Sequence, residues 1–170
     1  SQQGRNTTTM DTTRLAGKHV LITGGAQGMG AAVGKYYAAQ GAKVCLGDVN
    51  LDGAQAVADE IIADGGVATA VQLDVTKRES AAAAVAHTVK EFGSINVLLN
   101  NAGINKPLFF LDITEENWQR IMDVNAWGTL VCMQEAAKQM RDQGKQEYPY
   151  KIINVGSILS REAFIDVTVY

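Results

Sequence analysis

The stretch TGGAQGMG, residues 23–30, places glycines at positions 24, 28 and 30. It follows the apolar run KHVLIT and precedes a segment of helical composition that begins near Gly28. Glycine adopts positive φ at low cost and has no Cβ to cover its backbone N–H, and the first turn of a helix presents its positive dipole end to an anion. A pyrophosphate group suits both properties. The stretch therefore predicts a phosphate-binding turn between a first strand and a first helix.

Short apolar runs alternate with longer helical segments along the rest of the chain. The runs are rich in Val, Ile and Leu, which is typical of strands buried on both faces. Strand–helix alternation at this spacing indicates βαβ units and a parallel sheet with helices on both faces. The expected strands are residues 18–23, 42–48, 67–74, 95–100 and 150–155, and the expected helical segments are residues 28–40, 51–64, 77–92 and 115–143. We therefore predict an α/β fold, a doubly wound parallel sheet of the Rossmann type with at least five strands.

We expect one dinucleotide-binding domain over residues 15–170, preceded by a flexible tail at residues 1–14. The chain has 170 residues, of which 46% are hydrophobic, and this is enough to bury a core of ordinary size. The segment at residues 115–143 is longer than a usual helix, so we expect two helices to meet or a helix to kink at residues 125–128.

The charge and composition exclude several classes of partner. A net charge of −3 without any block of basic residues argues against nucleic acid or an anionic membrane surface. No apolar run approaches the roughly 20 residues of a membrane span, and we expect a cytoplasmic protein with a small-molecule partner. Cys45 and Cys132 lie in apolar stretches and are expected to be buried thiols. We predict no metal site, because His19 enters the first strand and His87 lies on a helix face expected to be exposed.

Asp48 ends the second predicted strand at about the distance after the glycines, roughly 20 residues, where an acid grips ribose hydroxyl groups. Its carboxylate accepts hydrogen bonds from the 2′- and 3′-OH groups and repels a 2′-phosphate. This position predicts NAD rather than NADP as the cofactor. A solvated aspartate at a strand end remains the alternative.

The glycine spacing resembles the TGxxxGxG turn of the short-chain dehydrogenase/reductase family. Three further segments resemble that family: LDVT at residues 73–76, NNAG at residues 100–103 and NAWG at residues 125–128. The 13 residues from Ser157 to Tyr170 also match the separation of the family's serine from its YxxxK tyrosine.

The resemblance implies cofactor contacts for the matching positions. Asp74 is expected to meet the adenine amino group and Val75 to pack on that ring, while Asn101 and the small Ala102–Gly103 pair lie beneath the nicotinamide ribose. A capping or turn residue is the alternative at these positions. The residues assigned to NAD are Gly24, Gln27, Gly28, Met29, Gly30, Asp48, Asp74, Val75, Asn101, Ala102, Gly103 and Tyr170.

The resemblance also implies three catalytic residues. Tyr170 is the expected general acid/base that exchanges a proton with the substrate oxygen, Ser157 hydrogen-bonds that oxygen, and hydride moves between the substrate carbon and nicotinamide. Asn125 is expected to hold a water through its backbone at the helix kink, and a buried, satisfied amide is its alternative role. A serine hydrolase is disfavoured, because Leu159 replaces the second glycine of the G-x-S-x-G elbow.

In the family, a lysine four residues after the tyrosine lowers the tyrosine pKa, and this sequence stops before that position. We therefore expect a fragment of a longer enzyme, truncated at the catalytic tyrosine. Two functions stay open. One is an NAD-dependent oxidoreductase acting on a secondary alcohol or ketone, such as a small polyol or sugar alcohol. The other is an NAD-binding module that does not catalyse. The resemblance further implies a homo-oligomer, a dimer or tetramer, that pairs through the helix containing Asn125.

Overall fold

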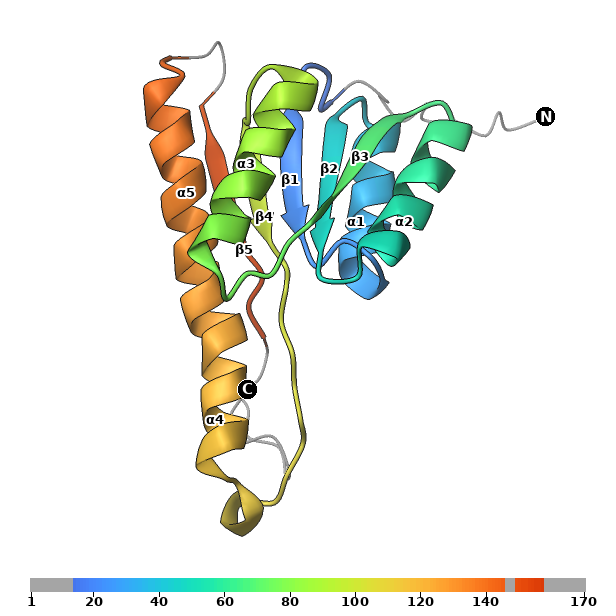
Figure 1. The fold of residues 1–170 in the computed structure, drawn as a ribbon. Helices are drawn as coiled ribbons and strands as arrows, with labels where there is room; N and C mark the ends of the chain where they lie inside the picture. Colours follow the sequence, from blue (N-terminus) through green and yellow to red (C-terminus); the bar gives the residue numbers. More distant parts are fainter. Residues whose placement is uncertain (1–13, 146–148, 158–170) are drawn as a thin grey trace, which may run out of the picture.

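A five-stranded parallel sheet forms the centre of the computed structural model, which describes residues 14–145 and 149–157 (Figure 1). The strand order is β3-β2-β1-β4-β5, so the chain crosses from one side of β1 to the other when it enters β4. All neighbouring strands pair in parallel. The strands are β1 (His19–Thr23), β2 (Lys43–Asp48), β3 (Val67–Gln72), β4 (Val97–Asn100) and β5 (Lys151–Asn154). The predicted doubly wound α/β fold is confirmed.

Helices cover both faces of the sheet. The helices α1 and α2 pack on one face, and α3 and α5 pack on the other, while α4 continues the line of α5 beyond the carboxyl ends of the strands (Figure 1). The helical segments are α1 (Gly28–Ala39), α2 (Leu51–Ala63), α3 (Arg78–Phe92), the 3-10 turn η1 (Phe110–Asp112), α4 (Glu115–Met122), the π-helical turn η2 (Asp123–Gly128) and α5 (Thr129–Asp142).

The side chains of β1 alternate between two hydrophobic cores. Val20 and Ile22 are fully buried against α1 and α2, whereas Leu21 packs with Cys45 and residues of α3 and α5. A period of two is the geometry of a strand, and a central strand needs apolar residues on both of its faces. This requirement explains the uninterrupted apolar run that precedes the glycine turn.

The prediction that all five strands are buried on both faces is wrong for β3 and β5. In the described part of the chain, β3 pairs only with β2, and β5 pairs only with β4. Val67 of β3 is 47% exposed and Ile153 of β5 is 39% exposed. These two strands lie at the edges of the described sheet, where fewer neighbours cover an apolar side chain.

The predicted break in the long helical segment is confirmed. The π-helical turn η2 separates α4 from α5, and such turns commonly mark functional sites. Gly128 ends this turn against Val75, since a Cβ on Gly128 would lie 2.6 Å from Val75 Cγ2. Glycine at this position allows the helix to approach the loop that follows β3.

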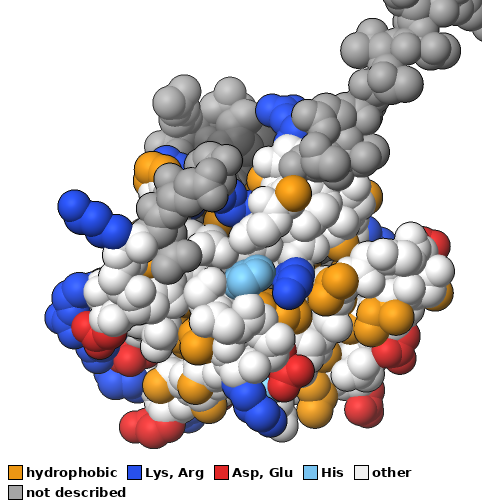
Figure 2. Space-filling model, turned by 90° about the horizontal axis from the view of Figure 1, so that it is seen from above, with side chains coloured by type: hydrophobic (Ala, Val, Ile, Leu, Met, Phe, Trp, Pro, Cys, Tyr) orange, Lys and Arg blue, Asp and Glu red, His pale blue; other side chains and the backbone are white. Residues whose placement is uncertain are grey.

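The end of the molecule at the amino termini of the strands is seen in Figure 2. Basic and acidic side chains are interspersed there with hydrophobic ones, and no single sign of charge dominates this face.

The expectation that His87 is exposed is wrong: the ring is half-buried, with Nε2 3.0 Å from Thr69 Oγ1. Among the described residues, no group of three or more His, Cys, Asp or Glu side chains is arranged to hold a metal ion. The described helices include none long and apolar enough to cross a bilayer.

Candidate functional site

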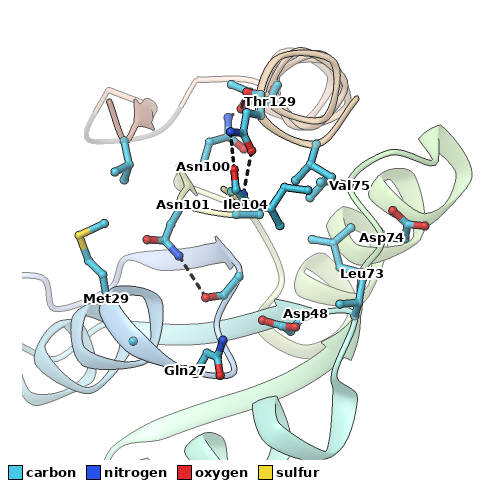
Figure 3. A pocket seen from close by; sticks show the side chains of 18 of the residues that line it. Gln27, Met29, Asp48, Leu73, Asp74, Val75, Asn100, Asn101, Ile104 and Thr129 are labelled. Carbon is cyan, nitrogen blue, oxygen red and sulfur yellow. Dashed lines mark hydrogen bonds between the residues drawn. The ribbon is translucent and has the colours of Figure 1, made fainter. Parts of the chain in front are cut away.

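A cavity of about 730 Å³ lies at the carboxyl ends of the five strands (Figure 3). In doubly wound folds this edge of the sheet is where ligands bind. Twelve of the predicted site residues line it: Gly24, Gln27, Gly28, Met29, Asp48, Asp74, Val75, Asn101, Ala102, Gly103, Asn125 and Ser157. Its other lining residues are Val49, Leu73, Asn100, Ile104, Arg120, Val124, Thr129, Val155 and Gly156. The structure therefore brings most of the predicted residues together.

The glycine turn combines tight packing with open space. Gly24 has φ +70°, and a Cβ there would lie 2.9 Å from Ala102 Cα. Gly28 begins α1 with φ +56°, and a Cβ on it would meet no described atom within 4 Å. The first turn of α1, where a helix has backbone N–H groups without helical partners, thus begins at an uncovered residue that lines the cavity, which suits an anion such as a pyrophosphate.

Gly30 differs from the other two glycines of the motif, because it is buried and does not line the cavity. A Cβ on Gly30 would lie 2.0 Å from the Gly24 carbonyl oxygen and 2.6 Å from Asn101 Nδ2. The absence of a side chain at Gly30 therefore allows the turn to close on the end of β4. Its contribution to the site is the shape of the turn.

Thr23 and Asn101 join the ends of β1 and β4 beneath the cavity. Thr23 Oγ1 accepts from the backbone N–H of Asn101 at 3.1 Å and of Ala102 at 2.9 Å. Asn101 Nδ2 donates to the carbonyl oxygens of Thr23 at 3.1 Å and Gly24 at 3.0 Å, and Figure 3 shows the Asn101 side chain directed at the glycine turn. Sequence reasoning missed Thr23, whose only signal was its place as the first residue of the motif.

Asp48 is held at the cavity wall by backbone groups on both of its carboxylate oxygens. Oδ2 accepts from Ala26 N at 3.0 Å, and Oδ1 accepts from Asn50 N at 2.9 Å. The side chain of Asn50 in turn accepts from Gly53 N and caps α2. Each carboxylate oxygen has a further lone pair, so the fixed carboxylate can still accept hydrogen bonds from ligand hydroxyl groups. This arrangement differs from the alternative of a freely solvated strand-end aspartate.

Asp74 and Val75 belong to the turn after β3. In Figure 3 they lie across the cavity from Gln27 and Met29. Asp74 Oδ1 accepts from the backbone N–H of Thr76 at 3.0 Å and from its hydroxyl at 2.7 Å, and Asp74 N donates to Ser80 Oγ. One oxygen of Asp74 thus stabilises the turn, as the alternative interpretation expected. Val75 is buried and gives this part of the cavity an apolar wall.

Asn125 lies in η2 and reaches the segment that follows β4. Its Oδ1 accepts from Ile104 N at 2.8 Å, and its Nδ2 donates to Ile104 O at 2.9 Å. The Asn125 carbonyl oxygen accepts from Thr129 Oγ1 at 2.8 Å. The side chain is therefore a satisfied amide that fixes the cavity wall at Ile104, a residue that sequence reasoning missed.

Asn100 provides an unsatisfied polar atom at the cavity. The residue is 4% exposed, and its Nδ2 donates to Asn154 Oδ1 at 2.9 Å. Asn100 Oδ1 has no hydrogen-bond partner among the described residues. A buried acceptor without a partner indicates a missing donor, such as a bound molecule or water. Together with the open glycine turn and the fixed carboxylate of Asp48, it shows that the residues present suit a polar, phosphate-bearing cofactor.

Ser157 is the last described residue and lines the cavity next to Val155 and Gly156, directly after β5. Tyr170 lies outside the described residues. Of the predicted Ser157–Tyr170 pair, the structure therefore describes only the serine.

Residues 18–170 match the family model described as short chain dehydrogenase. The chain belongs to the short chain dehydrogenase family. It is 40% identical over 157 residues to a sorbitol dehydrogenase of Cereibacter sphaeroides, an alignment that covers 92% of this chain and 59% of that protein. It is 42% identical over 145 residues to a 3-alpha-(or 20-beta)-hydroxysteroid dehydrogenase of Mycobacterium tuberculosis, covering 85% of this chain and 53% of that one.

Solved structures agree with the family assignment. A short-chain type dehydrogenase/reductase from Mycobacterium marinum superposes with a TM-score of 0.87 at 35% identity, covering 94% of this chain and 64% of the other. A dehydrogenase/reductase from Sinorhizobium meliloti gives a TM-score of 0.85 at 33% identity, with coverages of 95% and 63%. The chain thus spans less than two thirds of the length of each of these four relatives.

Proposed function

We propose that this chain is the NAD-binding part of an oxidoreductase that transfers a hydride between nicotinamide and a secondary alcohol or ketone. The observation that carries the proposal is one cavity that joins the glycine turn, the Asp48 carboxylate and Ser157. Its volume of about 730 Å³ lies within the range of small-molecule sites, about 300–1,000 Å³. Family membership supports the same class of reaction.

The residues assigned to the cofactor divide along the cavity. The turn at Gly24 and Gly28 and the start of α1 would hold the pyrophosphate, because they offer backbone N–H groups without a covering Cβ. Asp48 would accept from the ribose hydroxyl groups, and Asp74 and Val75 would receive the adenine. Ala102 and Gly103, small residues at the end of β4, would lie beneath the nicotinamide ribose.

Asp48 supports NAD rather than NADP. The backbone N–H groups of Ala26 and Asn50 already orient the carboxylate. Turning it away from a ligand would therefore break two hydrogen bonds. A 2′-phosphate at the ribose would place like charges close together, whereas free hydroxyl groups form charge-assisted hydrogen bonds.

Chemistry at the substrate falls to the residues at the opposite end of the cavity. Bound NAD would supply the carbon that accepts or donates the hydride. Ser157 would hydrogen-bond the substrate oxygen, and Tyr170 would exchange the proton with it. An ordinary tyrosine has a pKa of about 10, so a nearby cation is needed to make it an effective base at neutral pH. We propose a small polyol or sugar alcohol as the substrate, which the identity to a sorbitol dehydrogenase supports.

We also propose that the protein acts as a homo-oligomer, a dimer or tetramer that pairs through the long helix of α4, η2 and α5. Trp118, Trp127 and Leu130 are large hydrophobic residues exposed along this helix, and this supports an interface there. Light scattering of the purified chain measures the assembly. Trp118→Glu is expected to lower its molar mass, and an unchanged mass would contradict the proposed interface.

Calorimetric titration of the full chain with NAD and NADP tests the cofactor assignment. We expect NAD to bind at least about tenfold more tightly than NADP, which corresponds to the loss of one charge-assisted hydrogen bond. Asp48→Asn removes the charge. It is expected to lower the affinity for NAD and so to reduce the ratio of NAD affinity to NADP affinity. Asp59→Asn, on the exposed face of α2, removes an equal charge away from the cavity and serves as the control. Equal affinities in the wild-type chain would refute the preference for NAD.

Hydride transfer is tested separately from binding. The full-length protein is mixed with NAD and a panel of secondary alcohols that includes sorbitol, and NADH formation is followed by absorbance. Turnover supports the oxidoreductase. Binding of NAD without turnover of any alcohol would favour the alternative, an NAD-binding module.

A further inference from the structure

Arg120 on α4 lies where two hollows of the surface meet. It lines the cavity described above together with Val124, which is one helical turn further along. It also lines a second hollow of about 710 Å³. The other residues of this second hollow are Asp74, Thr76, Glu115, Glu116, Gln119, Asp123 and Val124. Arg120, Val124 and Asp74 are thus shared by both hollows.

The helical segment that continues from α4 into η2 packs closely against Val75, in the turn after β3. The contact is made at Gly128, where a Cβ would lie 2.6 Å from Val75 Cγ2 and 2.9 Å from Val75 Cβ. The cavity wall next to this contact is built by Val75 and Val124. Arg120 lines the same cavity as Val75 and Val124 and adds a charged side chain to this apolar part of its lining.

The side chain of Arg120 makes no hydrogen bond or ion pair with any residue that the structure describes, although acidic residues stand nearby along α4 and η2. Glu116 precedes it by four residues and Asp123 follows it by three, which are the spacings of helical ion pairs. By contrast, Arg78 pairs with Glu135 and Arg141 pairs with Asp142. The exposed guanidinium of Arg120 is thus available to a ligand in the cavity.

The charges around Arg120 favour an uncharged partner over a phosphate group. Four carboxylates line the second hollow, those of Asp74, Glu115, Glu116 and Asp123, and they disfavour an anion. The open N–H groups that suit a phosphate lie instead at Gly28, at the start of α1. A guanidinium group is flat and weakly hydrated, and it stacks well on the face of an aromatic ring or a nucleobase.

We propose that Arg120 binds the adenine base of the cofactor by stacking on its ring, opposite the wall formed by Val75. The proposal rests on the proposed function, since it assigns one more residue to the NAD site. Arg120 would make the adenine end of the site a contact between two separate segments, the turn after β3 and the helix α4. A ligand that lacks the base would gain nothing from Arg120.

Ligand titrations of the full chain test this assignment. NAD, adenosine monophosphate and nicotinamide mononucleotide are titrated into the wild type, Arg120→Ala, Arg120→Lys and Arg141→Ala, with binding followed by protein NMR. We expect Arg120→Ala to lower the affinity for NAD and for adenosine monophosphate about five- to tenfold. The affinity for nicotinamide mononucleotide is expected to stay within about twofold of the wild-type value. Arg120→Lys keeps the charge but not the planar group, so it is expected to stay at least about threefold weaker than the wild type. Arg141→Ala, which removes an equal charge from the exposed end of α5, is expected to bind all three ligands like the wild type.

Three results would overturn the assignment. The first is unchanged NAD affinity in Arg120→Ala. The second is an equal loss for nicotinamide mononucleotide, and the third is full recovery by Arg120→Lys; either of these means that Arg120 acts by charge on the phosphates. A wild-type chain that binds neither NAD nor adenosine monophosphate overturns the proposed function itself, which separates that failure from a failure of the Arg120 assignment.

Discussion

The side-chain amide of Asn125 hydrogen-bonds both backbone polar groups of Ile104, at 2.8 Å to the nitrogen and 2.9 Å to the oxygen. Gln143 makes the same pair of bonds to Ile95, with Oε1 accepting from the nitrogen at 3.2 Å and Nε2 donating to the oxygen at 2.6 Å. Ile95 precedes β4 and Ile104 follows it. The long helical segment therefore holds the chain on both sides of β4, and each amide satisfies backbone groups that no neighbouring strand reaches.

Asn125→Ala is expected to lower the free energy of unfolding by about 2–3 kcal/mol, because it leaves the N–H and C=O of Ile104 without their partners. Ile104 and Asn125 both line the cavity, so NAD affinity is expected to fall as well. Urea unfolding measures the first effect, and calorimetric titration measures the second.

Gln143→Ala is the matched control for Asn125→Ala. It removes an equivalent pair of bonds at Ile95, and neither residue lines the cavity. We expect a similar loss of stability with NAD affinity within about twofold of the wild type. If both variants keep wild-type NAD affinity, the amide of Asn125 does not shape the site.

Gly30→Ala is expected to disrupt the turn that begins the cavity. The new Cβ would lie 2.0 Å from the Gly24 carbonyl oxygen, and a backbone atom yields only if the turn moves. We expect a loss of about 3 kcal/mol in the free energy of unfolding and at least tenfold weaker NAD binding. Gly103→Ala provides the comparison, since its Cβ would lie 3.4 Å from Asn125 Oδ1, an acceptable contact. Equal stability of the two variants would contradict the role assigned to Gly30.

The fold could be predicted from the sequence where a segment's own composition decides its environment. β1 and β4 lie in the middle of the sheet, and their apolar runs reflect burial on both faces. The exposure of β3 and β5 could not be predicted in the same way, because it depends on which strands lie beside them. The break at η2 was predictable, since Asn125 and Gly128 are poor residues for a helix interior.

The motifs were enough to predict where the candidate site lies. They were not enough to predict the role of each residue in it. Gly30 and Asn125 were assigned to the cofactor and the reaction, whereas their contacts in the structure are with Gly24 and Ile104. The contacts of Gly30 with Asn101 and of Asn125 with Ile104 join segments far apart in the chain. The same is true of Thr23, which reaches Asn101 and Ala102 across 78 and 79 residues. A short motif contains no information on such partners, and Arg120 lies outside all of the motifs.

Cys45 and Cys132 are expected to resist thiol reagents in the native protein. Burial raises the pKa of Cys45 to about 12 and that of Cys132 to about 11, and the nearby carboxylate of Glu135 adds to the effect on Cys132. Since the thiolate is the reactive form, both side chains should be alkylated slowly near neutral pH and rapidly in denaturant. Mass spectrometry after iodoacetamide treatment counts the modified thiols. Native labelling of either cysteine at the rate of a free thiol would show that its site is open to solvent.

The stability of the protein is expected to fall as the pH drops below that of neutral water, with His19 as one cause. Burial lowers the pKa of His19 from its ordinary 6.5, and the charge of Lys43 lowers it further, while a hydrogen bond with Ser94 partly opposes both. The unfolded chain therefore takes up a proton near pH 6.5 that the folded chain refuses. The contribution of neutral His19 to the free energy of unfolding is complete above pH 6.5. It is lost as the pH falls from 6.5 through the lower pKa of His19 in the folded chain. Urea unfolding at several pH values between about 5 and 8 measures this slope. His19→Gln, which cannot titrate, is expected to show a shallower slope than the wild type, and an identical slope would exclude His19 as its source.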